Sequence, residues 1–417
     1  MTDNNSIFAD NTIEGYIMIG NGFDLECGLP TSYRNYLDFL DGIHEYLQRG
    51  KSVRPEELKP FEKYIPNRKN NETLINAVIN NPNINKIEYL NQWDFVSKNF
   101  WFYYFKNALY VKGWVDFENE IAKVIKAIEN NYNNHLKDEV DSDDEIVFSK
   151  NTKLYDIFEK ATKYPSTYGS SEIIKKINHK YDPHLEWFTF AGSPYGNSNM
   201  TYSSFKDKLL KDLNLLIYGF ELYLHDFVET IDVKPTKNIE RLINYLFETS
   251  ERYVLCFNYT TTFERMLKKA GIDAEYCYIH GKVSETPDLN KCDLVLGIDE
   301  YLEPKKIQDN LTFASFRKYN QRIFKRTDSS YMDWLDNIHD GESLAREMYI
   351  FGHSIGVTDK DIIRPFVLSN DMNTYIYYHN EDSFSSQVAN MTAIIGMDEL
   401  IQRTGGKEHT IEFRKQD

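Results

Sequence analysis

Short apolar runs rich in β-branched and aromatic residues recur at both ends of this 417-residue chain, and helical patterns separate them. Apolar runs of this kind between polar turns are typical of strands buried on both faces of a parallel sheet. We predict strands at residues 15–20, 253–257, 276–279, 294–297, 348–351 and 375–378. Alternation of strands and helices predicts an α/β fold with a doubly wound, Rossmann-type parallel sheet.

The segments between the strands carry helix signals. Apolar residues recur three and four positions apart over residues 33–40, which predicts a helix after the first strand. Thr261 and Glu264 have the S/T-x-x-E spacing of a capping box just past the second strand. Asp359 or Asp361 can begin a further helix as an acidic cap residue.

The composition changes between about residues 45 and 250, where the chain is polar, aromatic and helix-like. Apolar residues at helical spacing over 117–128 and an apolar-rich segment over 205–227 predict long amphipathic helices. We therefore predict an α/β nucleotide-binding domain from residues 1–44 and 251–417, interrupted by a helical insertion subdomain over residues 45–250.

Charge and composition exclude several classes of protein. The formal charge of −16, from 48 Lys and Arg against 64 Asp and Glu, opposes broad binding to nucleic-acid phosphates. No apolar run approaches the ~20 residues of a membrane helix, and the first residues lack the features of a signal peptide. The four cysteines show no metal-ligand spacing. We expect a cytoplasmic protein that has no contact with a membrane and needs no metal.

Polar or glycine-bearing turns follow four of the predicted strands. In open α/β sheets ligands bind outside the carboxyl ends of the strands, so these turns should converge on one binding rim. The turns are Gly20-Asn21-Gly22-Phe23-Asp24, Asn258-Tyr259-Thr260, His280-Gly281 and Gly352-His353-Ser354.

The first turn has the residues of a phosphate-binding loop. Gly20 and Gly22 allow a ligand to approach the backbone, and N–H groups at the start of the following helix can bind a phosphate. Because a carboxylate repels a pyrophosphate, we expect Asp24 to accept a hydrogen bond from a ribose hydroxyl or from a backbone N–H. A tight structural turn is the alternative interpretation.

The second and third turns carry groups suited to catalysis. The amide of Asn258 can both donate to and accept from a ribose or a water, although asparagine after a strand also serves as a turn residue. The ordinary pKa of histidine suits His280 to proton transfer near neutrality, and a structural histidine is the alternative.

The same rim carries residues that two other chemistries require. Gly352-His353-Ser354-Ile355-Gly356 matches the GxSxG form of a serine-hydrolase elbow, but the residues that follow predict a loop through Thr358 rather than a helix starting at Ser354. His280, His353 and His379 each follow a strand and, with Asp24, can be combined into a metal site, yet no HxH or HExxH spacing supports one.

A set of motifs covering both ends of the chain resembles the bacteriophage abortive-infection AbiH family. The motifs are IGNGFDLECGLPTSY (19–33), WVDFE (114–118), FNYTTTFE (257–264), IHG (279–281), LVLGIDE (294–300), FRKYNQRIFKRT (316–327) and IFGHSIGVTDKDI (350–362). This resemblance implies a role in defence against bacteriophages.

The same motifs resemble, more distantly, the NAD-binding fold of sirtuin-like proteins. Gly28-Leu29-Pro30 follows the first turn at the spacing of the sirtuin GIP motif, and the later turns occur in the sirtuin order. Three residues differ: Asp24 replaces a serine, Tyr33 an arginine and Thr260 an aspartate. The chain also lacks the four-cysteine zinc module of a sirtuin deacylase.

The sirtuin resemblance implies NAD as substrate or ligand. Asn258 would position the ribose or the attacking water, and His280 would act as the general base. The contacts to NAD would come from Gly20, Asn21, Gly22, Phe23, Asp24, Pro30, Tyr33, Gly352, His353 and Ser354.

We therefore predict a phage-defence effector that hydrolyses NAD to nicotinamide and ADP-ribose. Two alternatives stay open: a non-enzymatic nucleotide-binding sensor or interaction subunit, and a metal-dependent nuclease or phosphoesterase that uses the three histidines. The expected partners are NAD or a related nucleotide, a phage-derived trigger, another defence protein and a second copy of the chain. The sequence does not decide whether the helical middle senses a phage component, covers the pocket or mediates self-association.

Overall fold

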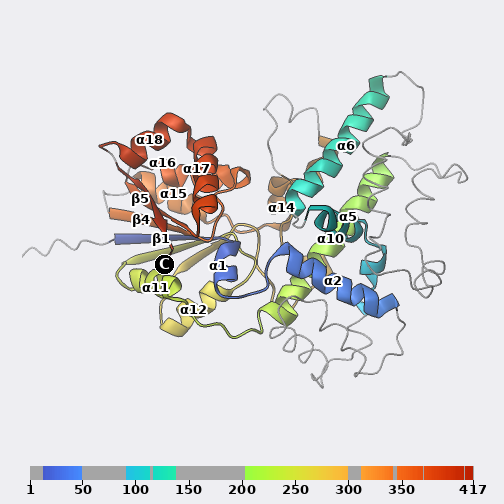
Figure 1. Ribbon diagram of the computed structural model, residues 1–417, viewed down its shortest axis with the longest axis horizontal. Coiled ribbons are helices and arrows are strands. Elements are labelled where there is room, and N and C mark those ends of the chain that lie inside the picture. The colour runs from blue at the N-terminus through green and yellow to red at the C-terminus, as the bar shows by residue number, and fades with distance from the viewer. Residues whose placement is uncertain are drawn as a thin grey trace, which may run out of the picture. The chain divides into compact units, whose positions relative to one another are not determined.

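A six-stranded parallel sheet forms the centre of one of two units in the computed structural model. The structure describes residues 13–48, 91–112, 116–137, 202–298, 311–340, 345–369, 371–407 and 409–416. The sheet unit comprises Met1–Pro30, Val228–Val283 and Arg326–Asp417. The helical unit comprises Thr31–Phe227 and Ser284–Lys325. Each unit is described by itself below, and Figure 1 shows the elements of both.

The strands of the sheet unit lie in the order β3-β2-β1-β4-β5-β6, with every neighbouring pair parallel. Their bounds are β1 Ile13–Ile19, β2 Glu251–Cys256, β3 Glu275–Tyr278, β4 Ala345–Phe351, β5 Met372–Tyr378 and β6 Ile411–Lys415. This is the strand order of dinucleotide-binding folds, in which strand addition reverses direction between β1 and β4. Ile19 pairs with both Cys256 and Phe351, so the three central strands end level with one another.

Helices cover both faces of the sheet (Figure 1). Side chains alternate along β1: Tyr16 and Met18 belong to one apolar core, while Ile17 and Ile19 belong to the other. The first core contains residues of α15 Tyr331–Asp340, α16 Lys360–Leu368, α17 Glu381–Ile395 and α18 Met397–Gly405. The second contains residues of α1 Asn21–Glu26, α11 Lys237–Phe247 and α12 Thr262–Ala270. A parallel sheet buried on both faces is therefore confirmed.

The helical unit has an aromatic core. The Tyr36 hydroxyl donates to the Leu216 carbonyl at 2.7 Å, and the Trp101 indole N–H donates to the Leu209 carbonyl at 2.9 Å. Its elements are α2 Tyr33–Gln48, η2 Asp94–Lys98, α5 Phe100–Lys112, α6 Phe117–Lys137, α10 Tyr202–Tyr223, η4 Leu289–Lys291, η5 Leu311–Phe316 and α14 Lys318–Lys325, with the turn η3 Leu224–Val228 at its boundary. The helices predicted at 33–40, 117–128 and within 205–227 are confirmed as α2, α6 and α10.

The strand predicted at 294–297 is wrong, because this buried apolar segment is irregular and lies in the helical unit. The side chain of Gln321 takes the place of a neighbouring strand. It accepts from the Leu296 N–H and donates to the Leu296 carbonyl, both at 3.0 Å. Lys325 donates to the Leu294 carbonyl. Side-chain hydrogen bonds therefore satisfy a backbone that the sequence pattern assigned to a sheet.

Two further features were not expected. The edge strand β6 was missed because its sequence, IEFRK, alternates apolar and charged residues and lacks a continuous apolar run. The two units also divide the chain at other positions than the predicted boundaries, since α11 belongs to the sheet unit and residues 284–325 belong to the helical unit.

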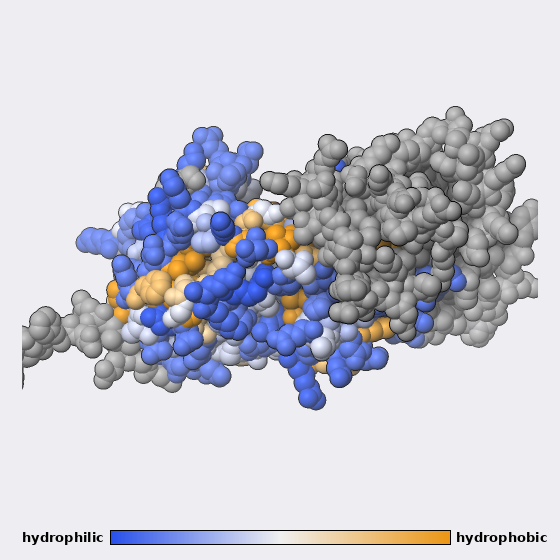
Figure 2. Space-filling model, turned by 90° about the horizontal axis from the view of Figure 1, so that it is seen from below, coloured by the Kyte–Doolittle hydropathy of each residue, from blue (hydrophilic) through white to orange (hydrophobic). Residues whose placement is uncertain are grey.

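On the face drawn in Figure 2, hydrophilic residues cover most of the coloured surface, and apolar residues form a band between them. Among the described residues, no helix combines the length and the apolar character that crossing a membrane requires.

Replacement of Gln321 by methionine tests the irregular segment. Methionine keeps the volume of the side chain but leaves the N–H and carbonyl of Leu296 without partners. Each unpaired buried polar group costs about 1–3 kcal/mol, so we expect Gln321→Met to lower the free energy of unfolding by that order. Urea denaturation measures the loss. Gln402→Met, at an exposed position of α18, is the control, and equal stability of the two variants would contradict the assigned role of Gln321.

Candidate functional site

The turn after β1 and the turn after β4 are held together by backbone contacts between glycines. The Gly20 N–H donates to the Phe351 carbonyl at 3.2 Å, and the Gly22 N–H donates to the Gly352 carbonyl at 2.7 Å. A Cβ on Gly22 would lie 2.7 Å from the Gly352 Cα, and a Cβ on Gly352 would lie 2.1 Å from the Phe23 nitrogen. These glycines are therefore required for the close approach of the two turns.

The binding of a pyrophosphate by residues 20–24 stays a prediction. In this structure the N–H groups of Gly20 and Gly22 already have protein acceptors. An anionic ligand at this turn would have to bind through other donors or displace these two contacts.

Asp24 and Asn258 form a buried polar group where β1 and β2 end. Thr260 donates its hydroxyl hydrogen to Asp24 Oδ2 at 2.8 Å, while Oδ1 has no hydrogen-bond partner among the described residues. Burial raises the pKa of Asp24 to about 7, and the hydrogen bond from Thr260 opposes this rise. Asn258 is only 4% exposed, and its amide lies close enough to Asp24 to oppose the rise in the pKa of that carboxyl as Thr260 does. Neither amide atom meets the distance and angle of a full hydrogen bond with the described residues.

Buried polar atoms in folded proteins nearly always have a partner, which is often an ordered water. The three atoms without one, Asp24 Oδ1 and the two amide atoms of Asn258, are one acceptor, one donor group and one further acceptor. A water or a ribose hydroxyl group can supply both the donor and the acceptor that they lack.

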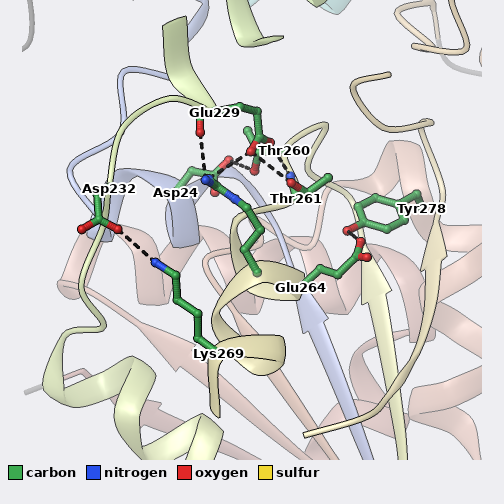
Figure 3. A network of polar contacts seen from close by, with 9 residues as sticks. Asp24, Glu229, Asp232, Thr260, Thr261, Glu264, Lys269 and Tyr278 are labelled. Carbon is green, nitrogen blue, oxygen red and sulfur yellow. Dashed lines mark hydrogen bonds and ion pairs between the residues drawn. The ribbon is translucent and has the colours of Figure 1, made fainter. Parts of the chain in front are cut away.

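Glu229 holds the turn that carries Thr260 and Thr261, as Figure 3 shows. Its carboxylate accepts from the Thr261 backbone N–H at 2.6 Å and from the Thr261 hydroxyl at 3.0 Å. Arg265 pairs with the same carboxylate at 2.9 Å. These contacts with Glu229 hold the turn in place. The negative charge of Glu229 also contributes to raising the pKa of Asp24.

The capping box predicted for Thr261 and Glu264 is wrong. Thr261 occupies the N-cap position of α12 but makes no side-chain cap hydrogen bond, and its hydroxyl is oriented towards Glu229, to which it donates. The Glu264 carboxylate accepts from the Tyr278 hydroxyl at 2.8 Å instead of reaching back to the cap (Figure 3). The side chains of Thr261 and Glu264 therefore make tertiary contacts in place of the capping-box hydrogen bonds.

His280 and His353 lie on either side of Asp359. His280 Nε2 is 3.3 Å from Asp359 Oδ1, and His353 Nε2 is 3.6 Å from Asp359 Oδ2. The ring of Phe257 packs against both imidazoles, with centroids 5.6 Å from His280 and 4.3 Å from His353. All three polar side chains are buried. The ends of β3 and β4 therefore meet at one carboxylate.

Asp359 was predicted only as a helix cap, and its contact with the two histidines was missed. It does occupy the N-cap position of α16, but its side chain makes no cap hydrogen bond and accepts instead from the Thr358 hydroxyl at 3.4 Å. The acidic residue in the loop after Gly352-His353-Ser354 was the available signal. Glu229 was also missed, and nothing in the sequence around it indicates its contact with Thr261.

The other predicted contact residues are placed as follows. Asn21 is exposed, whereas Phe23 is fully buried against Phe263, with ring centroids 5.1 Å apart. Pro30 is buried at the end of the first segment of the sheet unit. Tyr33 belongs to the helical unit, where its ring stacks on Phe117 at 4.2 Å. Phe23 thus has a packing role that is independent of any ligand.

The structure also places the residues on which the two alternative chemistries depend. Ser354 is exposed and lies in a loop that continues to η6 Val357–Asp359, so no helix starts at the serine as a nucleophile elbow requires. His379 is exposed. Among the described residues, no group of three or more His, Cys, Asp or Glu side chains is arranged to hold a metal ion.

A family model described as bacteriophage abortive infection AbiH matches residues 16–374. The chain belongs to the AbiH family. The match runs from β1 into β5 and includes the residues of the rim described above. The description of the family indicates abortive-infection defence against bacteriophages as the role of this AbiH protein. No curated protein matches the sequence.

The glycine contact can be tested with two alanine substitutions. Gly352 and Gly271 both have positive φ, 67° and 74°, but only Gly352 has backbone atoms where a Cβ would stand. An alanine in the left-handed region costs about 1–2 kcal/mol. We expect Gly271→Ala to lose about this amount of unfolding free energy and Gly352→Ala to lose distinctly more. Equal losses in denaturant titrations would show that the turns can separate.

The pKa of Asp24 predicts a pH-dependent stability. A carboxyl group whose pKa is about 7 in the folded state and 3.8 in the reference state stabilises the fold fully below pH 3.8 and loses this contribution as the pH rises through 7. One pKa unit corresponds to about 1.4 kcal/mol.

Asp24→Asn keeps an acceptor for Thr260 and removes the ionisation. We expect this variant to become more stable than the parent protein as the pH rises from about 5 to about 8.5. Urea denaturation across this range measures the difference, with Asp273→Asn, an exposed carboxyl of the same unit, as the control. If the difference in unfolding free energy between variant and parent did not change with pH, the raised pKa of the buried Asp24 would be contradicted.

Proposed function

We propose that this AbiH protein acts in phage defence by hydrolysing NAD, or a closely related nucleotide, to nicotinamide and ADP-ribose at the carboxyl ends of β1 to β4. The observation that carries the proposal is the buried amide of Asn258, which lies beside Asp24, makes no geometrically complete hydrogen bond within the described chain and belongs to the turn beside His280. The rings of Phe257 and Tyr259, the residues on either side of Asn258, lie 5.6 and 6.4 Å from the His280 ring.

The fit of the residues to NAD is best at the ribose. The open donor and acceptors of Asn258 and Asp24 match the hydroxyl groups of a ribose or a bound water. The near-neutral pKa of Asp24 reduces the negative charge that would otherwise repel the phosphates of the same ligand. The strand order supports a ligand here, because doubly wound sheets bind nucleotides where β1 and β4 diverge.

Cleavage of the N-glycosidic bond needs positioning more than a strong nucleophile. As the bond between ribose C1′ and the nicotinamide nitrogen breaks, nicotinamide leaves as a neutral molecule with the bonding electron pair, and the sugar becomes oxocarbenium-like. A water held by Asn258 attacks C1′, and His280 takes its proton. The products are ADP-ribose, nicotinamide and one proton.

A sensor that binds the nucleotide without turning it over would use the same residues. The buried amide of Asn258 favours this alternative equally, because its hydrogen bonds to a ribose do not depend on a reaction. Measuring turnover and binding in the same samples separates the two functions.

Incubation of purified protein with NAD, followed by chromatography of nicotinamide and ADP-ribose, tests the proposal. We expect turnover by the parent protein and a loss of at least about 100-fold in kcat with His280→Ala, because general-base catalysis contributes about 10²–10⁴-fold. Asn258→Ala should lose turnover as well as the rise in melting temperature that NAD causes in the parent.

Matched controls are available at exposed positions of the same sheet unit. His379→Ala and Asn373→Ala should keep the parent activity, because both side chains are exposed. Binding of NAD without turnover in the parent protein would favour the sensor. The absence of both binding and turnover would refute the proposed site.

A further inference from the structure

We propose that Asp359 is a positioning residue that holds His280 in the tautomer with its proton on Nε2, so that Nδ1 is the basic nitrogen of the site. The role of that nitrogen in turnover rests on the proposed function, whereas the tautomer itself does not. The backbone decides the tautomer of the neighbouring His353, which faces the same carboxylate.

The proton of neutral His353 is on Nε2. Its Nδ1 accepts a hydrogen bond from the Ile355 backbone N–H at 3.0 Å, and a ring nitrogen that accepts cannot carry a proton in the neutral imidazole. The protonated Nε2 then faces Asp359 Oδ2 at 3.6 Å. This distance is too long for a hydrogen bond, but the N–H dipole still favours the ionised carboxylate.

The backbone is strained where it fixes His353. Ile355 has a φ of 54°, in the left-handed region that β-branched residues rarely adopt. Among the described residues, only Arg326 and Ile355 have a positive φ without being glycine. Such strain is kept where the surroundings enforce it, and here it accompanies the N–H group directed at the His353 ring.

Asp359 is committed to the histidines rather than to its helix. It occupies the N-cap position of α16, where a carboxylate commonly accepts from the free N–H groups of the first turn, yet its side chain makes no cap hydrogen bond. Its carboxylate accepts from the Thr358 hydroxyl and faces the Nε2 atoms of both imidazoles. The Thr358 hydroxyl and the Nε2 proton of His353 both face this carboxylate, which therefore serves as an acceptor.

The tautomer of His280 follows from this acceptor. Nε2 of His280 is 3.3 Å from Asp359 Oδ1, so a proton on Nε2 is attracted to the carboxylate, whereas a lone pair there would be repelled by it. The lone pair of neutral His280 is therefore on Nδ1. A carboxylate that orients a histidine in this way also stabilises the imidazolium formed when Nδ1 takes a proton.

Nitrogen NMR of the unmodified, histidine-labelled protein tests the tautomer directly. The protonated and unprotonated ring nitrogens of a neutral imidazole have different ¹⁵N shifts, and the His280 signals are identified by their loss in His280→Ala. We expect Nε2 of His280 to carry the proton and Nδ1 to be unprotonated. A proton on Nδ1 of the neutral ring would overturn the proposal.

Asp359→Asn tests the consequence for turnover. The amide of asparagine can donate to Nε2 and so favours the other tautomer, with its proton on Nδ1. We expect kcat to fall about 10²- to 10⁴-fold with little change in KM, the effect of losing a carboxylate that orients a catalytic histidine. Asp361→Asn removes an exposed carboxyl from the same helix and should keep the parent kcat.

The two measurements separate this proposal from the proposed function. If the parent protein does not cleave NAD, the proposed function fails, and the NMR spectrum still decides the tautomer. If the parent protein cleaves NAD and a folded Asp359→Asn variant keeps its kcat and its His280 tautomer, the positioning role of Asp359 is refuted. If this variant does not fold, the spectrum of the unmodified protein remains decisive.

Discussion

The close backbone contact between the turns after β1 and β4 is the constraint on which the rest of the sheet unit depends. These two strands are neighbours at the point where strand addition reverses, and Gly22 and Gly352 let their turns meet through a 2.7 Å hydrogen bond. Without a Cβ at either position, the start of α1 and the loop after β4 pack directly against each other. The contact thereby fixes the positions of Asp24 and His353, which lie next to these glycines in the chain.

Around this contact the sheet unit concentrates its buried polar groups at the carboxyl ends of the strands. Two buried carboxyl groups illustrate how burial and hydrogen bonding act together. Burial raises the pKa of Asp24 to about 7, which leaves this carboxyl partly protonated near neutral pH. Asp359 instead accepts a hydrogen bond from the Thr358 hydroxyl and faces two imidazoles. One carboxyl group is thus suited to lie near a nucleotide and the other to orient a base, which is the physical basis of the proposed hydrolysis.

Much of the sheet was predictable because buried parallel strands have a local signature. Five of the six predicted strands are present, and the rim that carries Asn258, His280 and His353 follows from where they end. The apolar run at 294–297 has the same local signature but a different outcome, since Gln321 satisfies its backbone. A pattern of apolar residues reports burial, and it does not report which partner completes the hydrogen bonds.

The α/β alternation, the glycine turns and the residue types at the strand ends can be predicted from the amino-acid order, because each depends on neighbours along the chain. Which polar side chains meet depends on the packing of segments that are distant in the chain. The sequence predicts Asp359 and Thr261 as helix caps. In the structure the side chain of Asp359 faces His280, and the side chain of Thr261 donates to Glu229. A cap and a tertiary contact compete for the same oxygen atoms, and packing between distant segments settles that competition.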